Sequence, residues 1–343
     1  MRHSRGVAFA WLVIVVAAGS LAVARGADQR SVNETIWVAN RGAHTIRGFD
    51  AATGDLLNTI AMAPNSQPGD LAFAKRKLYV TEEFGTPPAV AIVDPETGEI
   101  IRRITFATGS RPHHVHASSS GTLIAVGLYG TDTVAVIDTR DDTLLGPWDT
   151  NVNTTTGRIH AGVFDNDGNT LYLANEGGNE LIAMDPFTGS VLWRLPVPSI
   201  HELAVTHNGK WAYVSRRTQN RLAVVDLESH DAYTDVLTLG LPDTLELSAN
   251  EKLLTVGLRV SPAQMAVVNT DTLQFQLVNL SEPGQTTTIG GHQWTSPSGR
   301  YTFAAFEGGT SPGVAVIDHW LGNTVVQRLP YPGRPHGVDL AHR

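Results

Sequence analysis

Histidines recur at matching places along this chain, and their number suggests a metal site. The stretch "GSRPHHVHAS" (109–118) carries His113, His114 and His116. The segments "GRIHAG", "SIHELA", "GGHQWT" and "RPHGVD" carry one histidine each in a comparable context. Since only 13 of 343 residues are histidine, this recurrence needs a physical reason. The histidines expected to meet in one site are His113, His114, His160, His201, His292 and His336.

Imidazole nitrogens bind copper, zinc, iron and nickel. The chain has no cysteine, so no thiolate can take part, and an all-nitrogen site in an exported protein favours copper over another transition metal. Arg111, Arg158 and Arg334 each precede one of these histidines by two residues. Residues i and i+2 of a strand share a face, so we expect these arginines beside the histidines. They are the predicted catalytic residues, and they would orient a small polar or anionic substrate.

Two other interpretations stay open. Histidine and arginine together could hold an organic cofactor that bears carboxylates, such as haem or a quinone cofactor. Alternatively, the histidines could line a hydrated channel that binds no ligand. Acidic side chains that could face the same arginines are Asp243, Glu202, Glu246 and Asp339.

The elements that must position these residues form an internal repeat. A short strand-like segment of the type "VAVID" recurs seven times, at intervals of 41 to 49 residues, ending at Asp50, Asp94, Asp138, Asp185, Asp226, Asn269 and Asp318. A period of 40 to 50 residues with several strands per unit is typical of a β-propeller. We therefore predict an all-β, seven-bladed propeller over residues 31–343. Equivalent positions of the repeat would form a ring around the central channel.

The ends of the repeat predict how the ring closes. Each repeat unit is predicted to hold four strands. The repeat begins with "TIWVANRG", which has the sequence of the second strand of a unit, and ends with "RPHGVDLAHR", which has the sequence of the first. We expect the last blade to combine the C-terminal strand with the N-terminal strands, which removes free sheet edges.

The segments "KLYVTEE", "TLYLANE" and "WAYVSRR", together with the "VAVID" copies, resemble the YVTN-type propeller repeats. The adjacent pair His113 and His114, with single histidines in other blades, resembles the copper-cluster propeller of nitrous oxide reductase. The haem-binding propeller of cd-type nitrite reductase is another relative by this resemblance. The resemblance implies either a copper-dependent oxidoreductase with a periplasmic redox partner protein, or a non-catalytic carrier or assembly factor for a haem or quinone cofactor.

Composition limits the partners. The net charge is −8 and the pI about 5.9, which opposes binding to a phosphate backbone and argues against nucleic acid. Residues 1–26 have two arginines before an apolar run that ends in small residues, the order of an export signal. We therefore expect a periplasmic or secreted protein with no membrane contact beyond the signal segment.

Overall fold

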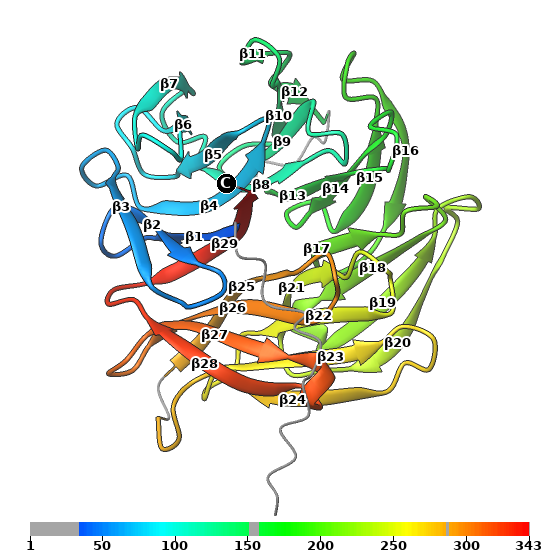
Figure 1. The fold of residues 1–343 in the computed structure, drawn as a ribbon. Helices are drawn as coiled ribbons and strands as arrows, with labels where there is room; N and C mark the ends of the chain where they lie inside the picture. Colours follow the sequence, from blue (N-terminus) through cyan, green and yellow to red (C-terminus); the bar gives the residue numbers. More distant parts are fainter. Residues whose placement is uncertain (1–33, 151–157, 286–287, 343) are drawn as a thin grey trace, which may run out of the picture.

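Seven antiparallel sheets stand around a central axis in the computed structural model, which describes residues 34–150, 158–285 and 288–342 (Figure 1). The predicted seven-bladed β-propeller is confirmed. The predicted export signal at 1–26 lies outside the described residues. Within the described ranges, no helix has the length and apolarity needed to cross a membrane.

Each blade orders its strands from the channel outwards. The first strands line the channel and are β4 (Pro68–Ala74), β8 (Pro112–Ala117), β13 (Ile159–Phe164), β17 (Ile200–Val205), β21 (Pro242–Leu247), β25 (Thr288–Thr295) and β29 (Pro335–His342). The second strands are β1 (Glu34–Asn40), β5 (Lys77–Glu82), β9 (Leu123–Leu128), β14 (Leu171–Asn175), β18 (Trp211–Arg216), β22 (Leu253–Leu258) and β26 (Tyr301–Gly308).

The third strands carry the "VAVID" repeat and are β2 (Thr45–Asp50), β6 (Ala89–Val93), β10 (Thr133–Asp138), β15 (Glu180–Met184), β19 (Arg221–Asp226), β23 (Gln264–Asn269) and β27 (Gly313–Asp318). The outer strands are β3 (Leu56–Ala61), β7 (Ile100–Thr105), the pair β11 (Thr143–Leu144) and β12 (Trp148–Asp149), β16 (Val191–Pro196), β20 (Tyr233–Thr238), β24 (Phe275–Asn279) and β28 (Thr324–Pro330). Two short 3-10 helices are η1 (Arg217–Gln219) and η2 (His319–Leu321).

The ring closes as the sequence predicts. Strand β29 pairs antiparallel with β1, with Val338 opposite Val38 and Leu340 opposite Ile36. These four side chains are buried together in one apolar cluster. The first and last described strands therefore share a blade, and β1 is paired on both of its edges.

Every channel-lining strand has a register shift at its start. In β8, Pro112 lies opposite Leu128 and Val115 opposite Val126, so two residues of β8 face one residue of β9. Equivalent shifts occur in β4, β13, β17, β21, β25 and β29. A bulge of this kind interrupts the strict alternation of side chains. Neighbouring residues at this level can therefore both point into the channel.

Candidate metal-binding site in the channel

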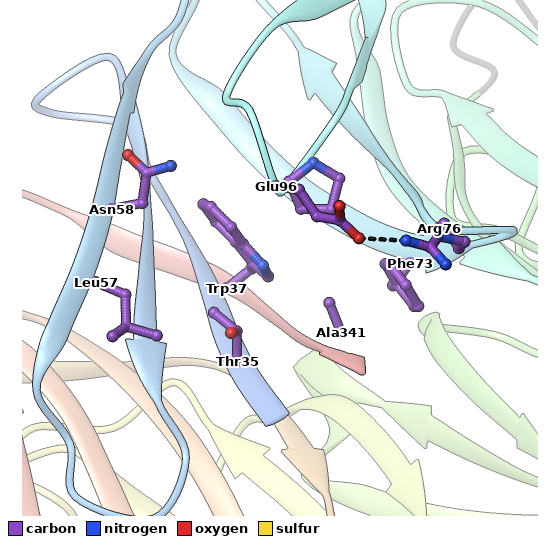
Figure 2. Close-up of a pocket in the computed structure, with 9 residues that line it drawn as sticks. Thr35, Trp37, Leu57, Asn58, Phe73, Arg76, Glu96 and Ala341 are labelled. Atoms are coloured by element: carbon purple, nitrogen blue, oxygen red, sulfur yellow. Dashed lines mark hydrogen bonds and ion pairs between the residues drawn. The ribbon is translucent and has the colours of Figure 1, made fainter. Parts of the chain in front are cut away.

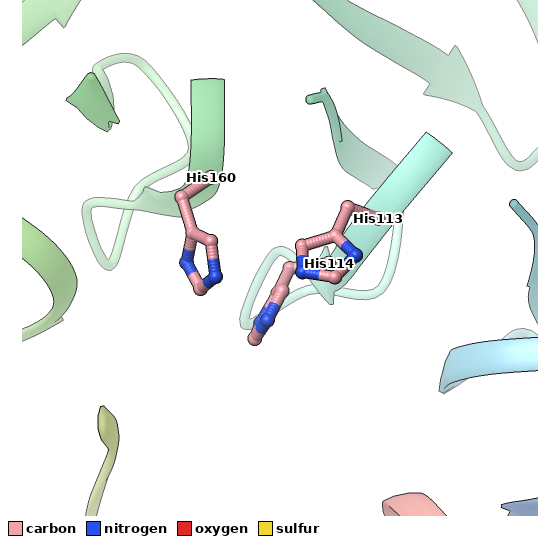
Figure 3. A group of neighbouring side chains, drawn as sticks. All are labelled: His113, His114 and His160. Atoms are coloured by element: carbon pink, nitrogen blue, oxygen red, sulfur yellow. The ribbon is translucent and has the colours of Figure 1, made fainter. Parts of the chain in front are cut away.

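The bulges bring the predicted histidines together near one end of the channel. His113 and His114 are the two consecutive residues of the β8 bulge, and His160 is the extra residue of the β13 bulge. Figure 3 shows these three imidazoles turned toward a common space between two blades. The ring centroids are 4.7 Å apart for His113 and His114, 5.0 Å for His113 and His160, and 4.1 Å for His114 and His160.

The row of imidazoles continues on both sides of this group. His201 lies 3.7 Å from His160, measured between ring centroids. On the other side, His292 lies 4.2 Å from His114, and His336 lies 4.5 Å from His292. The bulge explains why His292 reaches the row although it is one place out of line in the repeat. All six histidines predicted to share a site are thus adjacent.

Several sets of these side chains have the spacing of metal ligands. In each set, one ligand atom per residue lies within 4.8 Å of the others, and the four sets are His113–His114–His160, Asp70–His114–His292, His114–His116–Glu202 and His160–Glu176–His201. His114 belongs to three of the four sets, so it is the centre of the cluster.

His336, His113 and His201 each have a ring nitrogen beside a protein acceptor. His336 Nδ1 lies 3.1 Å from the Gly69 carbonyl, so this nitrogen carries the hydrogen. His113 Nδ1 lies 3.3 Å from Glu83 Oε2, and His201 Nε2 lies 2.8 Å from Asp243 Oδ1. A ligating histidine commonly fixes its ring by such a bond and uses the other nitrogen for the metal.

Burial keeps most of the cluster uncharged. It lowers the pKa of His114, His160, His292 and His336 well below the ordinary value, and neighbouring histidines and a nearby arginine (Arg217 for His160, Arg41 for the other three) add to the effect. For His201, burial opposes protonation, but Asp243 and Glu176 outweigh it and raise the pKa. The neutral rings are in the state that binds a metal ion, whereas His201 is suited to carrying a proton.

Arginines and carboxylates surround the channel mouth, the end formed by the loops that join second to third strands. Arg111 Nε donates to Glu83 Oε1 at 3.1 Å, and Arg41 Nη2 lies 3.2 Å from Glu83 Oε2. Arg334 Nε donates to Glu307 Oε2 at 2.8 Å. The predicted Arg111 and Arg334 are therefore at the mouth, each held by an acidic partner.

Arg158 reaches the mouth in a different way. Its guanidinium lies 5.5 Å from the centre of the Tyr129 ring, and that of Arg111 lies 5.0 Å from the same ring. Tyr129 donates from its hydroxyl to Glu176 Oε2 at 2.9 Å, and its ring packs at a tilt against that of His113. The three predicted arginines lie just before β8, β13 and β29 rather than within them, so the loops, and not strand alternation, bring them to the histidines.

The mouth carries an excess of positive charge. Arg217 Nη1 donates to Asp243 Oδ1 at 2.8 Å, and Arg259 lies between Asp243 and Glu307. The charged groups described around the mouth are six arginines and four carboxylates, namely Arg41, Arg111, Arg158, Arg217, Arg259 and Arg334 with Glu83, Glu176, Asp243 and Glu307. Such a mouth attracts an anionic or strongly polar molecule.

Below the histidines lies the lower channel, a cavity of about 300 Å³. It is lined by His114, His116 and four buried carboxyl groups. Burial is the main cause that raises the pKa of these carboxyls, to about 8 for Asp70 and Glu246 and about 7 for Glu202 and Asp339.

Sequence reasoning missed Asp70 as a site residue. In the repeat, Gly69 stands at the position that His113 has in the next blade, and glycine has no side chain that could bind a metal. Because the bulge turns two successive residues inward, Asp70 takes the place that His114 has in the next blade, and its Oδ1 lies 3.6 Å from His292 Nδ1. Reading "PGD" against "PHH" would have found it.

A second pocket lies at the far end of the first two blades, where Arg76 and Glu96 form an ion pair beside Trp37 and Phe73 (Figure 2). Its described lining contains no histidine. Among the described residues, none of the metal-binding sets includes a residue of this pocket, so the channel cluster remains the candidate site.

Comparison with known proteins gives a family and a fold. A family model described as "Lactonase, 7-bladed beta-propeller" matches residues 105–288. The uncharacterized protein YncE of Salmonella typhi is 24% identical over 252 residues, covering 68% of each chain.

Among solved structures, the Pseudomonas aeruginosa periplasmic gluconolactonase PpgL is similar over 90% of this chain and 99% of its own, with 19% identity and a TM-score of 0.68. The dihydro-heme d1 dehydrogenase NirN is similar over 92% of this chain and 76% of its own, with 16% identity and a TM-score of 0.62. At these identities the structural similarity establishes the fold alone.

Proposed function

Since this chain belongs to the seven-bladed β-propeller lactonase family, whose model covers more than half of it, we propose that it hydrolyses a small lactone at a metal ion in the channel. The observation that carries this proposal is the convergence of His113, His114 and His160 beneath a positively charged mouth. Three neutral imidazoles with an open side form the ligand set of a hydrolytic metal ion.

The metal would act as a Lewis acid on the lactone carbonyl and on a water molecule. Water adds to the carbonyl carbon, the ring C–O bond breaks, and a proton passes to the departing ring oxygen, which yields a hydroxy acid. His201 supports the proposal because Asp243 and Glu176 favour its protonated form, and it lies next to His160. We assign His201 to this proton transfer.

The mouth residues would orient the substrate. Arg158 packs on the ring of Tyr129, whereas Arg111 and Arg334 form ion pairs with Glu83 and Glu307. Polar groups of this kind suit the hydroxyls and carbonyl of a sugar lactone. PpgL is a periplasmic gluconolactonase, and on the basis of the similarity to PpgL we propose that this protein acts in the periplasm.

Metal content and lactone hydrolysis test this function together. Protein stripped with a chelator and reloaded with Zn²⁺, Mn²⁺ or Cu²⁺ should open the ring of gluconolactone only in a loaded form. His160→Ala should lose the metal and at least about 100-fold of the rate, while His207→Ala, a surface histidine 57% exposed at its side chain, should keep both. Equal rates for stripped and loaded protein would contradict the proposal.

A second candidate is a copper-dependent oxidoreductase with a periplasmic redox partner protein. The observation that favours it is the unbroken row from His201 through His160, His114 and His292 to His336. Several adjacent nitrogen ligands suit more than one copper ion. Copper bound in stoichiometric amounts, with an absorption spectrum that a reductant bleaches, would favour this candidate over a hydrolase.

The carrier of a haem or quinone cofactor is the non-catalytic alternative, and the arginines of the mouth would then pair with its carboxylates. A titration followed by absorbance, with haem added to metal-free protein, distinguishes it from both enzymes.

A further inference from the structure

We propose that the channel binds a second metal ion, held by His114, His116 and Glu202 on the side of the lower channel. This inference rests on the proposed function, because the second ion would share His114 with the ion bound by His113, His114 and His160. His116 and Glu202 belong to no set predicted from the repeat.

The first observation is that the ligand atoms are buried and have no hydrogen-bond partner among the described residues. These atoms are His114 Nδ1, His116 Nε2 and Glu202 Oε2. The side chains of His114 and Glu202 are each only 2% exposed. Leaving buried polar atoms unsatisfied is costly, and a bound cation would satisfy them together.

The second observation is the distance between these atoms. His114 Nδ1 lies 3.0 Å from Glu202 Oε2, and one ligand atom each of His114, His116 and Glu202 lies within 4.8 Å of the others. Ligand atoms about 2.0–2.2 Å from one zinc ion lie at similar distances from each other. The nitrogens and the oxygen are therefore already near the separations that one ion needs.

The third observation is how Glu202 is fixed. Its Oε1 accepts from the backbone amide of Leu203 at 3.2 Å, and Glu202 is the residue that follows the extra residue of the β17 bulge. One carboxylate oxygen is thus held by the backbone, which directs Oε2 to the imidazoles. Two histidines and a glutamate are a recurrent ligand set for a divalent metal ion with open positions.

The open positions would face water. His114, His116 and Glu202 all line the cavity of about 300 Å³ in the lower channel. A neutral imidazole has one free ring nitrogen, so His114 would bridge the two ions as an imidazolate, and its N–H proton would be released to water when the second ion binds. One ion would then face the mouth, and the other would face the lower channel.

Counting metal ions in the full chain tests this inference. Stripped protein is loaded with Zn²⁺, desalted and analysed for zinc per chain, and the same protein loaded with Cu²⁺ is examined by electron paramagnetic resonance. We expect two ions in the wild type, with the signal of a coupled pair. In Glu202→Gln and in His116→Ala we expect one ion and the signal of isolated Cu²⁺.

Glu246→Gln is the matched control, because Glu246 is a buried carboxyl of the same cavity that belongs to no ligand set; it should keep two ions. One ion in the wild type that neither Glu202→Gln nor His116→Ala changes would overturn the second site and leave the proposed function intact. No ion in the wild type would overturn both. Circular dichroism identifies a variant that has not folded, and the wild-type count alone then decides.

Discussion

Single residues at the mouth combine charge with burial. Glu83 is 2% exposed and contacts Arg41, Arg111 and His113. Burial alone would raise its pKa, but the hydrogen bond from His113 and the arginine charges outweigh it and lower the pKa to about 2. The ionised carboxylate therefore stabilises the fold, and it also holds Arg111 and Arg41 beside the cluster.

We expect Glu83→Gln to lower the free energy of unfolding by about 2–3 kcal/mol at pH 7. Because the folded pKa is depressed below the ordinary 4.5, this contribution is present above pH 4.5 and is lost as the pH falls toward 2. The difference between variant and wild type should therefore shrink by half or more at pH 3, measured by urea unfolding. Glu96→Gln, in an exposed ion pair with Arg76, should change stability by less than about 0.5 kcal/mol.

Glu246 gives the opposite pH dependence. Its pKa is raised to about 8 by burial and by Asp339, Glu202 and Asp70, so the folded chain keeps a proton that the unfolded chain releases above pH 4.5. Stability is then lost as the pH rises from 4.5 to 8. We expect metal-free Glu246→Gln to be about 1–3 kcal/mol more stable than wild type at pH 8 and to differ little at pH 5. An equal gain at both pH values in urea unfolding would contradict this account.

Some residues of the candidate site could be predicted from the sequence alone, and others could not. The six histidines were predictable because a ring of equivalent repeat positions must converge at the axis. The roles of Asp70, His116 and Glu202 were not, because they depend on which face each side chain takes after a bulge. The hydrogen bond that holds Glu202 Oε1 and leaves Oε2 free has no signal in the sequence.

At the scale of elements, the bulge at the start of each channel-lining strand builds the site. The repeat predicted the strands themselves, since β10 covers the same residues 133–138 as its "TVAVID" segment. It did not predict the bulges, because an extra residue in one strand appears only when the partner's register is known.

Gly127 of β9 packs against the backbone of the β13 bulge in the next blade. A Cβ at this position would lie 2.6 Å from the backbone carbonyl oxygens of His160 and Ile159. Since backbone cannot move aside as a side-chain end can, we expect Gly127→Ala to cost about 1–3 kcal/mol in thermal or urea unfolding and to weaken metal binding at His160. Gly240→Ala meets only the Val260 side chain at 3.1 Å and should leave metal binding unchanged. A Gly127→Ala protein with native metal affinity would show that the bulge does not set the position of His160.

At the scale of the whole molecule, one strand pairing holds the ring closed. Of the seven blades, the one formed by β29, β1, β2 and β3 alone joins strands from the two ends of the described chain. Its apolar cluster reaches into the neighbouring blade, where Phe303 and Val316 pack with Val338. A propeller without this strand has an open edge at β1 and two unsupported apolar faces.

A chain shortened to end at Gly333 should therefore fail to form a monomeric propeller. The lost strand removes His336 and the pairing of Val338 with Val38, and the exposed edge favours association with other chains. Size-exclusion chromatography with light scattering should detect aggregates and no metal-binding monomer.

A synthetic peptide of residues 334–343 should restore the monomer by adding as the missing strand. The same peptide with Val338→Pro should not restore it, because proline removes a backbone donor and cannot lie within a paired strand. A shortened chain that stays monomeric and binds metal without the peptide would show that closure by β29 is not what holds the ring together.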